Sequence, residues 1–305
     1  MKLLLLAAFA FAAAAPAQAD PLDDAKAAYE AGRSTDAVAI LTAAAEKGDA
    51  RAQYRLGLLS ENGYGMPQDE TKAVEWYMKA AAQGHSPAAN NLGALYAAGR
   101  GVAQSDAQAF QWYTKAVEAP ALEARDMSAA WSNLGTMYHW GRGTAKDDKR
   151  ARECYLKAAE GGSPYAQNNL AFLLEHGLGG PVDAAQAARW YRKAATNGFS
   201  VAQGNLAVVY ETGRGVAPDD GEALGWARKA AMQGEPRALF RLGRASERGR
   251  GVPLDLVEAY KWYLLSSERG EKRARHNLER LKTLLSPSQL DEAAKRARAA
   301  GVAHD

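Results

Sequence analysis

Leucine and alanine recur along this chain at a fixed distance. Seven leucines are each 36 residues apart, except for one step of 42 residues, and an alanine stands four residues before each of them. The leucines are Leu56, Leu92, Leu134, Leu170, Leu206, Leu242 and Leu278, and the alanines are Ala52, Ala88, Ala130, Ala166, Ala202, Ala238 and Ala274. Self-similarity at such a period indicates a tandem array in which each unit packs on its neighbours.

Each repeat predicts two helices joined by a tight turn. In the first repeat, Ala52, Leu56 and Leu59 lie at helical spacing and form one apolar face. Gly63 then ends this first helix, since glycine readily adopts the left-handed conformation that caps free carbonyls. The second helix begins at Asp69, whose side chain can cap free amides. One position of the second helix is tryptophan in five repeats and cysteine in the third, and we interpret all six as packing residues: Trp76, Trp112, Cys154, Trp190, Trp226 and Trp262.

The repeat resembles a known family. The unit "AANNLGALYAAGRGVAQSDAQAFQWYTKA" carries the Ala, Leu-Gly, Tyr, Gly-x-Gly-Val, Trp-Tyr and Lys-Ala positions of the Sel-one-like repeats, relatives of the tetratricopeptide repeats. The resemblance covers residues 50–278. It implies an all-α fold, a right-handed α-solenoid of stacked helix-turn-helix repeats, whose first helices line the concave surface.

The repeat register divides the chain into nine segments. We expect a signal peptide at 1–19, an N-terminal tetratricopeptide-like capping unit at 20–49, repeats at 50–84, 85–120, 121–162, 163–198, 199–234 and 235–270, and C-terminal capping helices at 271–305. The six extra residues of the long step fall in the Pro-containing loop 118–127. A closing helix is predicted with Ser286 at its N-cap and Pro287 in its first turn.

The first 19 residues have the layout of a secretory leader. Lys2 precedes an apolar run that ends in the small-x-small sequence Ala17-Gln18-Ala19, so cleavage is expected before Asp20. The run is short for a membrane span, and we expect no membrane insertion after cleavage. The mature chain would be periplasmic or, alternatively, fully secreted. Cys154 is the single cysteine, which excludes an intramolecular disulfide and argues against a lipid anchor at the mature N-terminus.

Catalytic signatures are absent from the sequence. Ser-x-x-Lys, Gly-x-Ser-x-Gly and His-Glu-x-x-His do not occur, and the Gly-rich turns lack the strand and Gly-Lys-Ser/Thr of a phosphate loop. The five histidines have no metal-ligand spacing and are interpreted as surface or capping residues: His85, His139, His176, His276 and His304. We therefore expect no enzyme, no cofactor and no metal. The competing class is a penicillin-binding, β-lactamase-like or cell-wall-active enzyme, because cysteine-rich members of the resembled family are associated with penicillin binding.

One column of residues lies at the border of the core face of the first helices. The residue before each repeat leucine is rotated by about 100° from it. The column reads Arg55, Asn91, Asn133, Asn169, Asn205, Arg241 and Asn277. The resemblance places it on the concave surface, where amides could bind the backbone of an extended peptide. Alternatively, the amides bond to one another or to the next helix and set the repeat spacing, and both interpretations remain open.

The segment "RALFRLGRASERGRG" carries a row of arginines on the same side. Arg237, Arg241, Arg244 and Arg248 are spaced 4, 3 and 4 residues apart, and Arg273, Asn277 and Arg280 continue the row in the next helix. Like charges at these spacings repel, and a bound carboxylate would relieve the repulsion. Related arrays clamp terminal carboxylates with Asn and a basic residue, a type of position that Asn205, Arg241 and Asn277 match. The alternative is a solvated face paired with nearby glutamates.

The sequence therefore predicts a non-catalytic protein-interaction scaffold or regulator of the bacterial envelope. Its groove would bind a peptide or an acidic segment of a partner, for example to restrain a sensor or an envelope enzyme. A secreted factor that binds host proteins is the alternative. Nucleic acid is not expected, since removal of the leader leaves a formal net charge of only +2. We expect a monomer.

Overall fold

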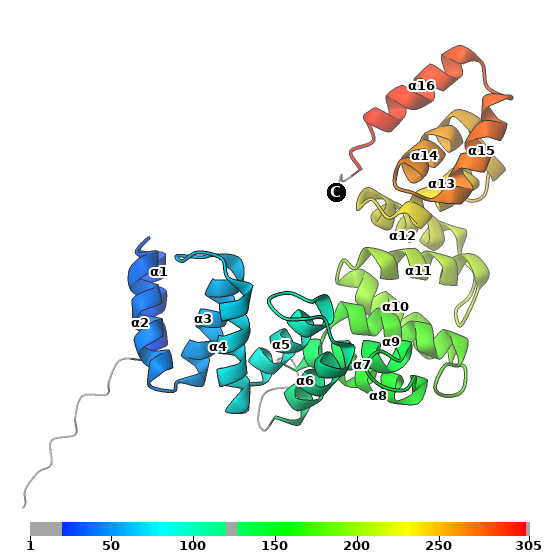
Figure 1. The fold of residues 1–305 in the computed structure, drawn as a ribbon. Helices are drawn as coiled ribbons and strands as arrows, with labels where there is room; N and C mark the ends of the chain where they lie inside the picture. The colour runs from blue at the N-terminus through cyan, green and yellow to red at the C-terminus, as the bar shows by residue number, and fades with distance from the viewer. Residues whose placement is uncertain (1–19, 120–126, 303–305) are drawn as a thin grey trace, which may run out of the picture. The chain divides into compact units, whose positions relative to one another are not determined.

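The computed structural model describes residues 20–119 and 127–302, and all the regular structure in these ranges is helical (Figure 1). The helices are α1 (Pro21–Glu30), α2 (Ser34–Glu46), α3 (Ala50–Asn62), α4 (Glu70–Ala82), α5 (Ser86–Ala98), α6 (Asp106–Glu118), α7 (Ser128–Trp140), α8 (Asp148–Glu160), α9 (Pro164–His176), α10 (Ala184–Thr196), α11 (Ser200–Thr212), α12 (Asp220–Met232), α13 (Pro236–Arg248), α14 (Leu256–Glu268), α15 (Lys272–Lys282) and α16 (Pro287–Arg298). The leader, most of the loop predicted to hold the six extra residues, and His304 lie outside the described residues.

The chain forms two compact units, one ending at Gln104 and the other beginning at Ser105. The first contains α1–α5 and the second α6–α16. Within each unit, helices that follow one another in the sequence pack together, as the predicted α-solenoid requires, except that the last helix, α16, packs on α14 (Figure 1). We call α3, α5, α7, α9, α11, α13 and α15 the first helices, and α4, α6, α8, α10, α12 and α14 the second helices.

The predicted helix ends are confirmed. Each of the six glycines that end α3, α5, α7, α9, α11 and α13 has a left-handed backbone, with φ between 64° and 73°. Every second helix is capped by the predicted Asp or Ser side chain, which accepts a backbone hydrogen bond. Ser286 caps α16 with Pro287 in the first turn, and a full capping box is present.

Tyrosine, and not tryptophan, is the central aromatic residue of the core. The tyrosines that follow the tryptophan column are fully buried: Tyr77, Tyr155, Tyr191 and Tyr263. The tryptophans are half-buried at the border of the core, and a lysine of the same helix packs over the indole, as Lys79 does 4.1 Å from the Trp76 ring centroid. The tryptophan column therefore packs as predicted, but at the edge of the core.

These tyrosines explain the glycine in the Leu-Gly pair. A Cβ atom on Gly57 would lie 2.4 Å from the ring of Tyr77, and one on Gly243 would lie 2.7 Å from the ring of Tyr263. The absence of a side chain on the first helix thus lets the ring of the second helix approach its backbone.

The second glycine of each turn makes a contact between repeats. Gly101 and Gly143 have positive φ, and a Cβ atom on them would lie 2.4 Å from the carbonyl oxygen of Glu70 and 2.2 Å from that of Asp106. Each turn therefore rests on the backbone at the start of a second helix in the preceding repeat. The Gly-x-Gly sequence fixes the stacking of repeats in addition to the turn.

The third repeat replaces the missing tryptophan with an indole from its first helix. Cys154 is buried, and Lys157, which corresponds to the lysines that cover tryptophan in other repeats, packs 4.0 Å over Trp131 of α7. Burial raises the pKa of the Cys154 thiol to about 12, so a reactive thiolate is disfavoured at neutral pH.

A substitution at Gly243 tests the close approach of Tyr263. Gly243→Ala should destabilise the protein by about 1–3 kcal/mol, because the added methyl group overpacks the ring. The matched control is Gly225→Ala on α12, where a Cβ atom meets nothing within 4 Å and alanine should stabilise the helix by about 0.5–1 kcal/mol. Chemical denaturation of both variants measures the difference, and equal stability would contradict the packing argument.

Candidate interaction surface on the first helices

Four positions of each first helix lie along one side of it. Residues spaced 4, 3 and 4 apart fall within an arc of about 60° on a helix. We call these positions the first-helix stripe. In the first unit they are Arg51, Arg55, Leu58 and Asn62 on α3, and Pro87, Asn91, Ala94 and Ala98 on α5. In the second unit they are Ala129, Asn133, Thr136 and Trp140 on α7; Tyr165, Asn169, Phe172 and His176 on α9; Val201, Asn205, Val208 and Thr212 on α11; Arg237, Arg241, Arg244 and Arg248 on α13; and Arg273, Asn277 and Arg280 on α15, followed by Leu284.

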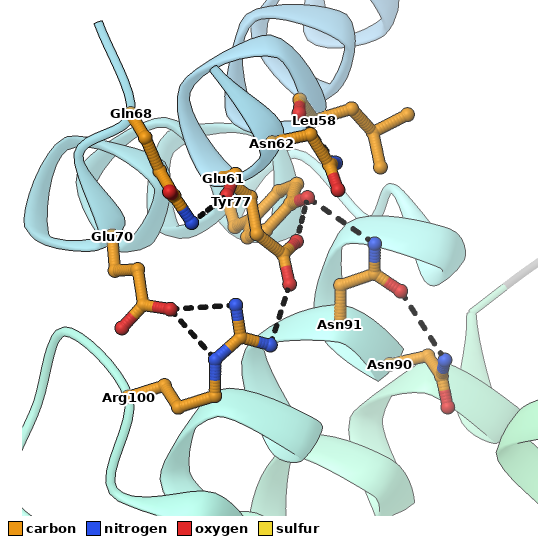
Figure 2. A network of polar contacts seen from close by, with 9 residues as sticks. All are labelled: Leu58, Glu61, Asn62, Gln68, Glu70, Tyr77, Asn90, Asn91 and Arg100. Carbon is orange, nitrogen blue, oxygen red and sulfur yellow. Dashed lines mark hydrogen bonds and ion pairs between the residues drawn. The ribbon is translucent and has the colours of Figure 1, made fainter. Parts of the chain in front are cut away.

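In the first unit, the asparagine of the stripe belongs to a polar network that joins two repeats (Figure 2). Asn91 donates to the hydroxyl oxygen of Tyr77 at 3.3 Å, and this hydroxyl donates to Glu61 at 2.7 Å. Arg100, from the turn of the next repeat, donates to Glu61 at 3.1 Å and to Glu70 at 2.7 Å. Burial and the neighbouring Glu61 carboxylate raise the pKa of Tyr77, which keeps its hydroxyl a donor.

The same contacts recur in the second unit. Tyr191 donates to Glu175 at 3.0 Å and Tyr263 donates to Glu247 at 2.6 Å. A first-helix asparagine again reaches the preceding repeat, as Asn277 donates to Glu247 at 3.5 Å. Another, Asn205, donates to Asn168 at 2.9 Å. These contacts confirm the packing interpretation for Asn91, Asn205 and Asn277, whereas peptide binding by the column stays a prediction.

In the fifth repeat, the glutamate at the position of Glu61 has a different partner. Ala227 stands where other repeats have the buried tyrosine, and Arg241 stands where the next repeat usually has asparagine. Arg241 forms an ion pair with Glu211, the counterpart of Glu61. Its guanidinium thus lies beside the carboxylate that a tyrosine hydroxyl contacts elsewhere. From the sequence, Arg241 was placed in the column and in the arginine row without being connected to Glu211, although the paired replacement at Ala227 is visible in the repeat alignment.

The remaining arginines of the stripe differ in how their charges are compensated. Arg280 pairs with Glu247, and Arg273 pairs with Glu271 at 2.9 Å. In the described ranges, no carboxylate lies within ion-pair distance of three of the four stripe arginines on α13. They are Arg237, Arg244 and Arg248. The predicted pairing with glutamates therefore holds for part of the row only.

Arg241 lies in a strongly positive environment. Its burial, together with the charges of Arg244, Arg273 and Arg250, lowers the pKa of its guanidinium to about 10. An anion bound nearby would oppose this effect and favour the charged state. Burial is the largest cause of this shift in the pKa of Arg241, and the three neighbouring arginines add to it.

Two hollows adjoin this cationic part of the stripe. A small cavity of about 40 Å³ is lined by Glu211, Asp220, Arg241, Arg244, Arg248 and Arg250, among others. A larger pocket of about 440 Å³ lies between α11, α13 and α15, and its lining includes Asn205, Glu235, Arg237, Arg241, Glu271 and Arg273. Arg241 separates the two hollows and lines both.

The structure therefore brings together six of the ten predicted groove residues around these hollows: Asn205, Arg237, Arg241, Arg244, Arg248 and Arg273. Asn133 and Asn169 are half-buried on α7 and α9, and Asn277 lies on α15 beside Glu247. Asn91 belongs to the other unit.

The histidines have local partners. His176 bonds to the carbonyl oxygen of Phe172 at 2.9 Å, as predicted for an imidazole near a helix end, whereas His139 contacts Asp148 at 2.6 Å. His85 caps α5 through Nδ1 and stacks on Tyr54. Across 20–119 and 127–302, we found no group of three or more His, Cys, Asp or Glu side chains that could hold a metal ion.

In the same ranges, every helix is too short or too polar to cross a membrane.

These features define a helical-repeat solenoid with a polar and aromatic stripe on its first helices. The model of the Sel1 repeat family matches residues 50–85, 86–120, 129–163, 164–199, 200–235 and 236–271, and the chain therefore belongs to this family. The resemblance seen in the sequence is thus confirmed. Sel1 repeat solenoids typically act in protein–protein interaction.

Two solved structures are similar over most of the chain. A protective antigen of uropathogenic Escherichia coli with the SLR fold is 32% identical over 92% of this chain, with a TM-score of 0.77. The match covers 61% of that protein's length. A Sel1 repeat protein from Oxalobacter formigenes is 28% identical, with a TM-score of 0.72, over 82% of this chain and 97% of its own. Among curated proteins, none matches the chain.

A double-mutant cycle tests whether Arg241 takes the place of the missing tyrosine as the partner of Glu211. Ala227→Tyr alone should destabilise the protein by about 1–3 kcal/mol, because the ring and Arg241 then compete for one carboxylate. Adding Arg241→Asn recreates the arrangement of the other repeats and should recover most of that loss. Denaturation of the two single variants and the double variant gives the coupling, expected to be at least about 1 kcal/mol. Additive effects would show that the two positions are independent.

Proposed function

We propose that this chain is a non-catalytic scaffold of the bacterial envelope that binds an acidic segment of a protein partner on α13 and α15. The observation that carries the proposal is the row of arginines without ion-pair partners, Arg237, Arg244 and Arg248, beside two hollows. Carboxylates suit such a surface because guanidinium groups bind them through paired hydrogen bonds.

The two best candidates for ligand contact are Arg244 and Arg248. Arg237 interacts electrostatically with Glu235 and Glu271, which offsets part of its charge. Arg241 is engaged with Glu211 and supports the fold. Arg244 and Arg248 line the small cavity, together with Glu211 and Asp220, and form no ion pair within the described ranges. Arg241 can therefore stabilise the fold while Arg244 and Arg248 attract an acidic segment.

Export is the second part of the proposal. The leader-like sequence ends at Ala19, and Asp20 caps α1 by accepting a hydrogen bond from the Leu22 amide at 3.0 Å. Asp20 also pairs with Arg51 at 2.9 Å. Cleavage before Asp20 would therefore leave the first cap and its contact with α3 intact. The similar E. coli protein is a protective antigen, which favours a place outside the cytoplasm and supports the secreted alternative alongside a periplasmic one.

Charge reversal tests acidic-segment binding. Arg244→Glu with Arg248→Glu should weaken binding of a fluorescein-labelled octaglutamate peptide by about tenfold or more, measured by fluorescence anisotropy at low salt. Arg241 is left unchanged, because a glutamate there would face Glu211 and disturb the fold.

The matched control reverses two exposed arginines of second helices, Arg189→Glu with Arg228→Glu. This variant has the same net charge and should keep its affinity. An equal loss in both double variants would indicate attraction by net charge alone, and no loss in the first would reject the arginine row as the site. Circular dichroism verifies that each variant is folded.

Processing of the leader gives a separate test of export. Expression of the full chain in E. coli should yield a periplasmic protein whose mass corresponds to a first residue of Asp20. A version that starts with Met followed by Asp20 should stay in the cytoplasm. Recovery of the intact chain with its leader in the cytoplasmic fraction would contradict the proposal.

A further inference from the structure

The first-helix stripe of the second unit changes chemistry between α11 and α13. On α7 and α9 it presents large aromatic side chains to solvent: Trp140 is 68% exposed, Tyr165 43% and Phe172 39%. On α11 it continues with Val201, which is 45% exposed, and Val208. On α13 and α15 arginine occupies six of the first seven stripe positions. A half with exposed aromatic and apolar residues between polar ones, here called the apolar half, is thus followed by a cationic half.

Contacts between neighbouring first helices show that the two halves adjoin. The hydroxyls of Thr136 on α7 and Tyr165 on α9 lie 3.3 Å apart. Asn205 on α11 donates to Asn168 on α9 at 2.9 Å. The pocket of about 440 Å³ then connects α11 with α13 and α15, and both Val201 and Arg237 line it. Apolar and cationic side chains of the stripe therefore meet in one hollow.

The exposed rings of Trp140 and Phe172 are connected through His139, whose side chain is only 13% exposed. The ring centroids of Phe172 and His176 lie 4.2 Å apart, and those of His139 and Trp140 lie 4.8 Å apart. The Phe172 ring also lies 6.5 Å from His139, which connects the two pairs. Single exposed apolar residues are ordinary on a protein surface, but a contiguous group marks an interaction site. Aromatic residues of this kind are common anchors in protein interfaces.

We infer that the stripe binds one extended, two-part protein segment, with apolar or aromatic side chains on α7–α11 and acidic side chains on α13–α15. This inference rests on the proposed function and specifies the class of segment that the same surface selects. The arginines supply the charge complementarity that defines the acidic part, and the exposed rings define the other part.

Geometry sets the distance between the two parts of the segment. Side chains of neighbouring first helices reach each other, as Asn205 and Asn168 do, so a spacing of about 10 Å gives a span of about 20 Å over the two steps from α9 to α13. An extended chain advances about 3.3 Å per residue, which places the acidic group about six residues from the apolar group. Asn169 and Asn205 lie between the two halves, where amides can bond to the backbone of such a chain.

Labelled synthetic peptides test the two-part surface. One peptide carries Trp-Phe-Leu, a Gly-Ser spacer and Glu-Asp-Glu, and a second has the reversed order, because an extended segment can bind in either direction. A third replaces the apolar residues with serine and keeps the acidic group. One of the first two should bind the mature chain about tenfold more tightly than the third, and shortening its spacer to about two residues should remove this advantage.

Two variants test whether the exposed aromatic rings cause the tighter binding of the two-part peptide. Trp140→Ser with Phe172→Ser should abolish the preference for the two-part peptide and leave the affinity for the serine-containing acidic peptide unchanged. The matched control, Met78→Ser with Leu156→Ser, removes comparably exposed apolar side chains from second helices and should retain the preference.

Equal binding of the two-part and acidic peptides would overturn this inference and leave acidic-segment binding in place. Failure of all the peptides to bind would overturn the proposed function as well. Loss of the preference in the Met78 and Leu156 control would also refute the assignment, because those residues lie outside the first-helix stripe.

Discussion

The packing of a buried tyrosine ring on the first helix is the constraint on which most repeats depend; the aligned first-helix residue is glycine at Gly57, Gly135 and Gly243 and alanine at Ala171. Tyr263 packs where a Cβ atom on Gly243 would collide with it, and its hydroxyl donates to Glu247. The contact brings the two helices of a repeat together and places a polar group at the edge of the core. Asn277 and Arg280 of the following repeat then bind the same carboxylate, so packing within one repeat also fixes the next.

This dependence gives the stripe both a structural and a functional part. Residues in line with the core border, such as Asn91 and Arg241, bond to the preceding repeat and have little freedom to vary alone. Residues one turn away on the same stripe, such as Phe172 and Arg244, have no comparable bond and can differ between repeats. The proposed partner surface is therefore built mainly from the second group and supported by the first.

Much of the fold could be predicted from the sequence, because the same helix-end and core residues recur in several repeats and each recurrence supports the same assignment. The capping glycines and the Asp or Ser caps lie where helix-end chemistry requires them, Gly63 and Asp69 among them. The pairing of Arg241 with Glu211 was not predicted, since it depends on a tyrosine missing from a different helix. The exposed group around Trp140 was also missed, because aromatic residues at helical spacing are usually core residues and only the structure shows which ones face solvent.

The shared carboxylate has a consequence for how such an array can change its length. Each bond set uses Glu and Tyr from one repeat but Asn and Arg from the following one, as Glu61, Tyr77, Asn91 and Arg100 show. A duplication or deletion in the 36-residue register preserves these bonds where it joins repeats that carry the full set, whereas repeats 2 and 3 have Ala97 and His139 in place of the glutamate. A duplication or deletion of any other length leaves a half-buried glutamate, such as Glu61, without the asparagine and arginine of the following repeat. Whole repeats can therefore be added or removed only in steps of the repeat length. Helix α15 ends the array, because its Asn277 and Arg280 bind Glu247 of the last complete repeat.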